Sequence, residues 1–151
     1  MTTRIDGGIE ILSSRVFPVS VSKLYAAFAE PSLLERWWGP DGFTNRITRF
    51  DLVPGGEWHI TMTNSDGTDF HNRCTFEIVE PGARIFYLHH EPMHVFTMDM
   101  HFASAEEHAR LTWRMTMERN RENLELKKFI AAANEQNFDR LGRVLAEHRE
   151  H

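Results

Sequence analysis

The sequence predicts one α+β domain over residues 1–151, in which a curved antiparallel sheet wraps around a long C-terminal helix. Two observations predict this fold. Between residues 45 and 119, apolar and polar residues alternate in short segments that Gly- and Pro-containing turns separate, which is typical of antiparallel strands. From residue 122 to about residue 148, apolar residues recur instead at spacings of three and four, as in an amphipathic helix.

The chain begins with an expected strand and a short helix. Residues 9–17 are apolar and β-branched enough for a strand, which Pro18 ends. Ser20 or Ser22 can cap the helix, which runs through Glu30 with apolar residues at helical spacing.

A second short helix starts at Pro31 and carries two adjacent tryptophans, Trp37 and Trp38, before Gly39 and Pro40 end it. Paired indoles bring roughly 150–250 Å² of surface each to one place. A third tryptophan follows at the start of the sheet. This concentration of aromatic surface predicts an apolar chamber with a lid.

Six further strands are expected to form a meander. Their predicted ranges are 45–53, 57–63, 70–80, 84–90, 94–103 and 110–119. Alternation is clearest in the last two. Their inward faces are predicted to carry Phe96, Met98, Met100 and Phe102, and Leu111, Trp113, Met115 and Met117.

The C-terminal helix is expected to be roughly 40 Å long, enough to lie across the whole sheet. Its apolar stripe is predicted to contain Leu126, Phe129, Ile130, Ala133, Phe138, Leu141 and Leu145. Because a twisted sheet curves away from a straight helix, we expect a space between the two.

The overall composition excludes several classes of function. A formal net charge of −5 without a basic stripe argues against nucleic-acid binding. The lone cysteine, Cys74, excludes an intrachain disulfide and is expected to be a small buried hydrophobe. Nothing resembles a signal peptide or a transmembrane segment, which predicts a cytoplasmic protein with no membrane insertion.

The leading functional hypothesis is the binding of a small apolar or amphipathic molecule in the space between sheet and helix. The residues predicted to lie at this site are Trp37, Trp38, Met98, Met100, Trp113, Met115, Phe129 and Ala133. Methionine is adaptable, which suits a wall for variable apolar ligands. No cofactor is expected.

A catalytic role would need a desolvated ionisable group on the chamber wall. The candidates are His90, whose position matches the parity of Phe86 and Leu88, then Arg73 and Glu118. They form no recognisable triad, so an enzyme is the less favoured hypothesis. The histidines lack convergent partners of the kind that zinc needs, so no metal site is expected.

The chain resembles the START-type, birch-pollen-allergen-like superfamily, often called SRPBCC. The resemblance is to its branch of homologues of the activator of the ninety-kilodalton heat-shock-protein ATPase. The matching segments are Val16–Ser20, Phe28–Pro40, Val53–Trp58, Phe76–Ile85 and Phe138–Leu141. They span nearly the whole chain in the expected order.

The resemblance implies a helix-grip fold with a hydrophobic cavity between the sheet and the long helix, and no metal or cofactor. Relatives include lipid carriers, polyketide cyclases and co-chaperone domains, so the resemblance does not imply one activity. The alternatives to ligand binding are an enzyme of the cyclase or hydrolase type and a co-chaperone-like or other interaction module, which could act through its sheet edge or as a homodimer. Many bacterial members carry Gly-Trp where this chain has Ala133-Asn134, a difference that should enlarge or reshape the chamber.

Overall fold

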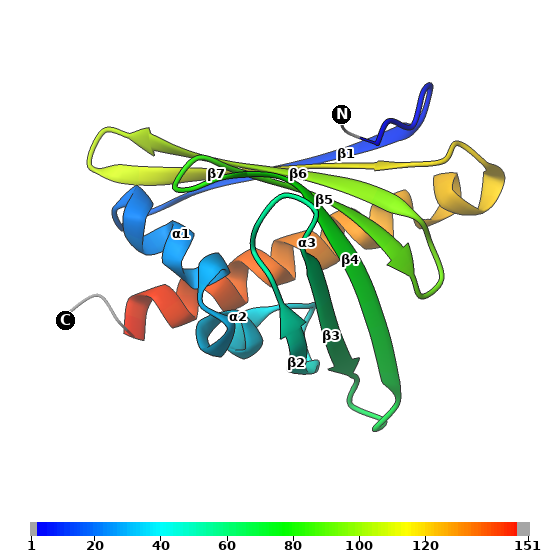
Figure 1. Cartoon of the computed structure of the whole chain (residues 1–151), viewed down its shortest axis with the longest axis horizontal. Coiled ribbons are helices and arrows are strands. Elements are labelled where there is room, and N and C mark those ends of the chain that lie inside the picture. The colour runs from blue at the N-terminus through cyan, green and yellow to red at the C-terminus, as the bar shows by residue number, and fades with distance from the viewer. Residues whose placement is uncertain (1–2, 148–151) are drawn as a thin grey trace.

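A computed structural model describes residues 3–147 and has the expected α+β helix-grip architecture. The long helix runs along the concave side of a curved sheet, and both short helices lie on that same side (Figure 1). In chain order the elements are β1 (Ile9–Phe17), α1 (Val21–Ala29), α2 (Pro31–Trp37), β2 (Thr44–Phe50), β3 (Glu57–Thr63), β4 (Asp69–Glu80), β5 (Arg84–Glu91), β6 (Phe96–Ala105), β7 (His108–Met117) and α3 (Arg121–Glu147).

The seven strands form one antiparallel sheet in the order β1-β7-β6-β5-β4-β3-β2. The pairing register of β4 with β5 shifts twice, between Arg73 and Cys74 and between Phe76 and Ile78. A third shift lies between Ile47 and Arg49 of β2. Such irregularities bend a strand and increase its twist, and here they accompany the curvature that brings the sheet around α3 (Figure 1).

The two short helices have the predicted end signals. The Ser20 side chain accepts a hydrogen bond from the Lys23 backbone nitrogen, so Ser20, and not Ser22, caps α1. Pro31 occupies the start of α2, where its missing N–H costs no helical hydrogen bond. α2 ends at Trp37, and Trp38 leaves the helical conformation.

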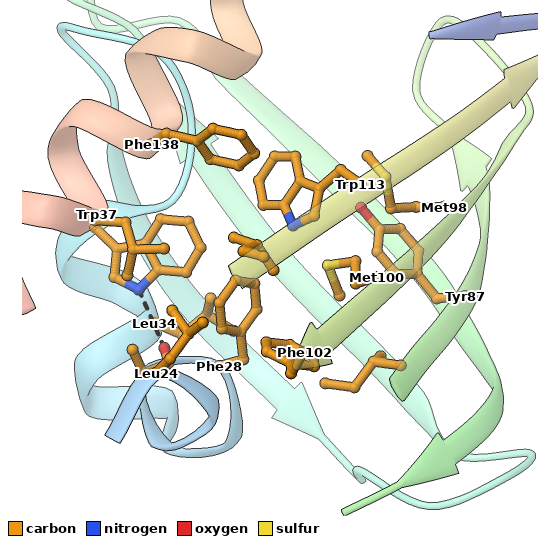
Figure 2. Packing of buried hydrophobic residues seen from close by; sticks show 14 of the residues in the cluster. Leu24, Phe28, Leu34, Trp37, Tyr87, Met98, Met100, Phe102, Trp113 and Phe138 are labelled. Carbon is orange, nitrogen blue, oxygen red and sulfur yellow. Dashed lines mark hydrogen bonds between the residues drawn. The ribbon is translucent and has the colours of Figure 1, made fainter. Parts of the chain in front are cut away.

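The C-terminal half of α3 is packed more tightly against the rest of the protein than its N-terminal half. Its C-terminal half is buried against β1 and the short helices, and the Phe138 ring lies 6.2 Å from that of Phe17 and 4.8 Å from that of Trp113. Figure 2 shows the Phe138 ring directed at Trp113. None of the helices within residues 3–147 is long and apolar enough to cross a membrane.

The predicted apolar stripe of α3 is wrong at Phe129, whose side chain is 73% exposed. Phe129 and Phe138 are nine residues apart, which at 3.6 residues per turn places them about 180° apart on the helix. The buried face of α3 contains three polar residues in addition to its apolar ones, namely Asn123, Asn134 and Asn137.

The predicted face of β5 is also wrong by one residue. Tyr87 and His89 point toward α3, while His90 lies on the outer face, where its ring Nε2 is 2.7 Å from the Thr75 hydroxyl. Phe86 is only 9% exposed and lies on that outer face beside the N-terminal segment. Because β5 buries apolar side chains on both faces, alternation could not identify the inner one.

Strand ends differ from expectation by a few residues, for local reasons. β2 stops at Phe50 because residues 51–56 form a compact turn, with the Val53 nitrogen 2.8 Å from the Asp51 carbonyl oxygen. A side chain at Gly56 would lie 2.0 Å from that same carbonyl oxygen, so only glycine fits there. β6 begins at Phe96 because residues 92–94 form a turn.

Candidate functional site

The space expected between sheet and helix is present as a cavity of about 350 Å³. This volume is within the usual range of small-molecule sites. The wall is mostly apolar, and the described residues that line it include no Asp, Glu, Lys or Arg. The lining residues come from the loop after α2, from β3 to β7, from the loop between β5 and β6, and from α3.

The four tryptophans form one aromatic cluster at this cavity. The Trp38 ring lies 5.4 Å from Trp37, 5.0 Å from Trp58 and 5.5 Å from Trp113, measured between centroids. Trp37 is fully buried, and its indole nitrogen donates to the Ala27 carbonyl oxygen, 3.1 Å away, as the dashed line in Figure 2 marks. Trp37 therefore supports the wall that Trp38, Trp58 and Trp113 line.

The structure brings together five of the eight residues predicted to lie at the ligand site. Those that line the cavity are Trp38, Met98, Trp113, Met115 and Ala133. The other three lie elsewhere: Trp37 and Met100 are part of the closed core, and Phe129 is on the surface. Trp58, Tyr87 and Asn72 also line the cavity, although the sequence analysis did not predict them.

The three candidate catalytic residues lie outside the cavity. His90 and Arg73 belong to the outer face of the sheet, where Arg73 pairs with Glu91 at 3.2 Å. Glu118 is exposed in the segment between β7 and α3. The cavity wall carries His89 and His94 in their place.

His89 is a buried imidazole on the cavity wall, 6% exposed and stacked on Phe96 with 4.4 Å between ring centroids. Its Nδ1 lies 2.7 Å from the His94 carbonyl oxygen, and its Nε2 lies 2.8 Å from Oδ1 of Asn72. Burial lowers the pKa of His89 below its usual value, although the hydrogen bond to His94 acts in the opposite direction.

Cys74 and Tyr87 also contribute to the wall, and burial raises the pKa of both side chains. The Cys74 thiol is 2% exposed, as the sequence analysis predicted, and stays protonated rather than becoming a nucleophilic thiolate. The Tyr87 hydroxyl points toward Trp113 and Met98 (Figure 2).

Two asparagines of α3, Asn134 and Asn137, face the cavity and were not among the predicted site residues, although the resemblance indicated that position 134 shapes the chamber. The Asn137 Oδ1 accepts a hydrogen bond of 2.8 Å from the Gly39 nitrogen, and the Asn134 Nδ2 donates to the Ser13 hydroxyl at 3.3 Å. A helical signal was available, because Asn134 lies four residues after Ile130, and Asn137 lies four residues before Leu141.

The 38–43 loop, which forms one wall of the cavity, is held by Arg140 of α3. The guanidinium nitrogens lie between 2.9 and 3.0 Å from four carbonyl oxygens of this loop, those of Trp38, Gly39, Pro40 and Phe43. Burial lowers the pKa of Arg140, whose nearest partners are these neutral carbonyls. The Asn137–Gly39 hydrogen bond fixes the same loop.

Within residues 3–147, no group of three or more His, Cys, Asp or Glu side chains could hold a metal ion. His89 and His94 line the cavity, whereas His101 lies on the outer face, 3.1 Å from Asp99. The wall of the cavity offers apolar surface together with a small number of hydrogen-bonding groups.

A family model described as "Activator of Hsp90 ATPase homolog 1-like protein" matches residues 18–146. None of the curated proteins matches the chain. The match begins directly after β1 and includes α1, α2, β2 to β7 and all of α3 except its last residue.

Solved structures with the same fold come from several bacteria. A protein from Arthrobacter aurescens has a TM-score of 0.85 at 19% identity, over 97% of this chain and 90% of its own. The AHSA1 protein from Silicibacter pomeroyi has a TM-score of 0.76 at 20% identity, over 95% and 100% respectively. DynU16, from the dynemicin biosynthetic locus, has a TM-score of 0.72 at 15% identity, over 91% of this chain and 47% of its own. At these identities the likeness shows the fold alone.

Proposed function

The chain belongs to the family of Activator of Hsp90 ATPase homolog 1-like proteins, and we propose that it binds a small hydrophobic or amphipathic molecule between the sheet and α3. The family is part of the SRPBCC superfamily, whose members commonly bind hydrophobic ligands. The cavity described above supplies the site.

The observation that carries the proposal is an apolar cavity of about 350 Å³ in an otherwise packed interior. The neighbouring core leaves a space of only about 10 Å³ around Phe28, Leu34 and Met100. Burying ligand surface on such a wall contributes about 25 cal/mol per Å² before the costs of association are subtracted.

A titration of intrinsic tryptophan fluorescence with fatty acids, sterols and aromatic polyketides tests the proposal. Trp38, Trp58 and Trp113 all line the cavity, so a ligand that enters it changes their emission. We expect saturable quenching or a spectral shift with at least one of these classes. Mass spectrometry of material extracted from the purified protein identifies any ligand that copurifies with it.

A pair of variants on neighbouring residues shows whether the cavity is the site. Ala133 lines the cavity, whereas Ala132 is exposed on the other side of α3. Ala133→Phe fills the space and should weaken binding by about tenfold or more, because it displaces ligand surface. Ala132→Phe should bind as the unchanged protein does. Equal binding by both variants would place the ligand elsewhere.

A second function, an enzyme of the cyclase or hydrolase type with an apolar substrate, is favoured by one observation. His89 is the desolvated ionisable side chain that such an enzyme needs on the cavity wall. Replacing His89 with Gln should then abolish turnover of a bound substrate while binding persists. Turnover that survives the substitution would reject this role for His89.

A further inference from the structure

The described residues that line the cavity include no Asp, Glu, Lys or Arg, and several polar groups there have no hydrogen-bond partner. Trp58 and Trp113 line the cavity at 2% and 1% exposure, and their indole N–H groups have no hydrogen-bond acceptor among the described residues. Trp37, which lies outside the cavity, does donate its N–H to a carbonyl oxygen. An unpartnered buried donor is destabilising, so these groups favour a ligand that supplies an acceptor.

Asn137 presents a donor whose orientation is determined by the backbone. The Gly39 nitrogen can only donate, so it holds Oδ1 of Asn137 and directs the side-chain NH₂ away from the loop. No hydrogen bond joins this Nδ2 to any described residue, although Asn137 is only 7% exposed and lines the cavity. The free N–H therefore belongs to the cavity wall.

Asn134 supplies the complementary acceptor one helical turn earlier on the same face. Its Nδ2 donates to the Ser13 hydroxyl, and its Oδ1 has no hydrogen bond with any described residue. Ser13 lies directly opposite Trp113 in the β1–β7 ladder, so the Asn134 amide is held beside this indole. A hydroxyl group suits this pair, because its oxygen accepts from Asn137 while its hydrogen donates to Asn134.

The lack of charged side chains on the described cavity wall distinguishes between charged and uncharged ligands. The described residues that line the cavity include no Lys or Arg to pair with a carboxylate, and burial disfavours the charged form of His89. The other imidazole of the wall, that of His94, is partly exposed in the loop between β5 and β6, away from Asn134 and Asn137 in the chain. From these observations we infer that the cavity takes an uncharged, mostly apolar ligand with a hydroxyl group, which Asn134 and Asn137 recognise. The inference rests on the proposed function of the same cavity and adds the ligand class.

Three probes with the same ring system test this inference by calorimetric titration at neutral pH: naphthalene, 2-naphthol and 2-naphthoate. We expect 2-naphthol to bind about tenfold more tightly than naphthalene, the effect of a net hydrogen bond or two. 2-Naphthoate should bind more weakly than 2-naphthol, because the described cavity wall has no Lys or Arg to pair with its carboxylate. Preferred binding of 2-naphthoate would overturn the inference.

The variant Asn134→Leu should remove most of the preference for 2-naphthol and leave the affinity for naphthalene unchanged or higher. Asn137→Leu should act in the same way, but it also breaks the bond to Gly39, so its folding is checked by thermal melting. Lys128→Leu, exposed on the same helix, is the control that should leave all three affinities unchanged. If both asparagine variants retain the preference, these residues are not the recognition site.

The outcomes separate this inference from the proposed function. Binding of naphthalene and 2-naphthol with equal affinity would reject hydroxyl recognition and leave the cavity as a ligand site. Binding of none of the probes, together with no response to fatty acids, sterols or polyketides, would reject the proposed function and the inference with it.

Discussion

Two opposing effects act on the imidazole of His89. The His94 carbonyl and Oδ1 of Asn72 are both acceptors, and a doubly protonated ring satisfies both. Burial opposes the second proton and is the larger effect, so the pKa of His89 lies below 6.5, its ordinary value. The ring is therefore neutral at neutral pH, and its one proton can be donated to only one of these two acceptors.

The lowered pKa makes part of the folding stability pH-dependent. A group that binds its proton less readily when folded contributes fully above its unfolded pKa, here about 6.5, and the contribution is lost as pH falls through the folded pKa. We therefore expect the free energy of unfolding to fall as pH drops below about 6.5. Urea denaturation between about pH 5 and pH 8 measures this dependence.

The variant His89→Gln should show a smaller fall in stability over the same pH range, because glutamine does not titrate. His108→Gln, an exposed position in β7, should behave as the unchanged protein does. If His89→Gln and the unchanged protein lose stability in parallel, His89 is not responsible for the dependence.

Single residues also show where sequence analysis succeeds. In β6 and β7 only one face is apolar, so alternation correctly assigned Met98, Trp113 and Met115 to the inside. In β5 both faces carry apolar side chains, and the prediction for His90 failed. The alternation of residues along a strand identifies its buried face only when the other face is exposed to solvent and polar.

At the scale of elements, α3 has two different parts. Its C-terminal half closes the core with Phe138, Leu141 and Leu145, all at most 3% exposed. Further toward its N-terminus it presents the short side chain of Ala133 and two polar amides to the sheet. A helix of uniform large apolar residues would fill this space, so the cavity follows from what α3 lacks at these positions.

Arg140 connects α3 to the 38–43 loop, and the sequence analysis did not single it out. Lysine keeps the charge but cannot reach four carbonyl oxygens at once, so Arg140→Lys should lower the free energy of unfolding by about 2 kcal/mol. For a chain of this size that corresponds to a loss of roughly 4–8 °C in melting temperature. Differential scanning calorimetry measures both quantities.

Arg143→Lys is the matched control for Arg140→Lys, since Arg143 is exposed on the same helix. It should melt within about 1–2 °C of the unchanged protein. A melting temperature for Arg140→Lys that equals that of the control would show that these carbonyl contacts do not stabilise the loop.

At the scale of the whole molecule, the proposed ligand would couple the two layers of the fold. The cavity wall includes residues of β3 to β7 and of α3, so a guest contacts both the sheet and the helix that it faces. A ligand that binds only the folded state stabilises it by mass action. The melting temperature should therefore depend on the concentration of ligand.

At free ligand one hundred times its dissociation constant, the added stability is about 2.7 kcal/mol, and the melting temperature should rise by roughly 5–10 °C. Thermal shift measurements across a ligand series test this expectation. Ala133→Phe should show little further shift with the same ligand, because its cavity is filled. A ligand that binds without any thermal shift would have similar affinity for the unfolded chain, and would not occupy the cavity.

The amino-acid sequence by itself determined the order of the elements, the strand and helix periods, the caps and turns, and the family, because each depends on neighbours along the chain. Only the tertiary structure decided which side chains meet in the cavity. The shifts of register in β4 and the rotation of α3 by about 100° per residue set those directions. That is why Phe129 lies outside, and why Asn134, Asn137 and His89 line the cavity.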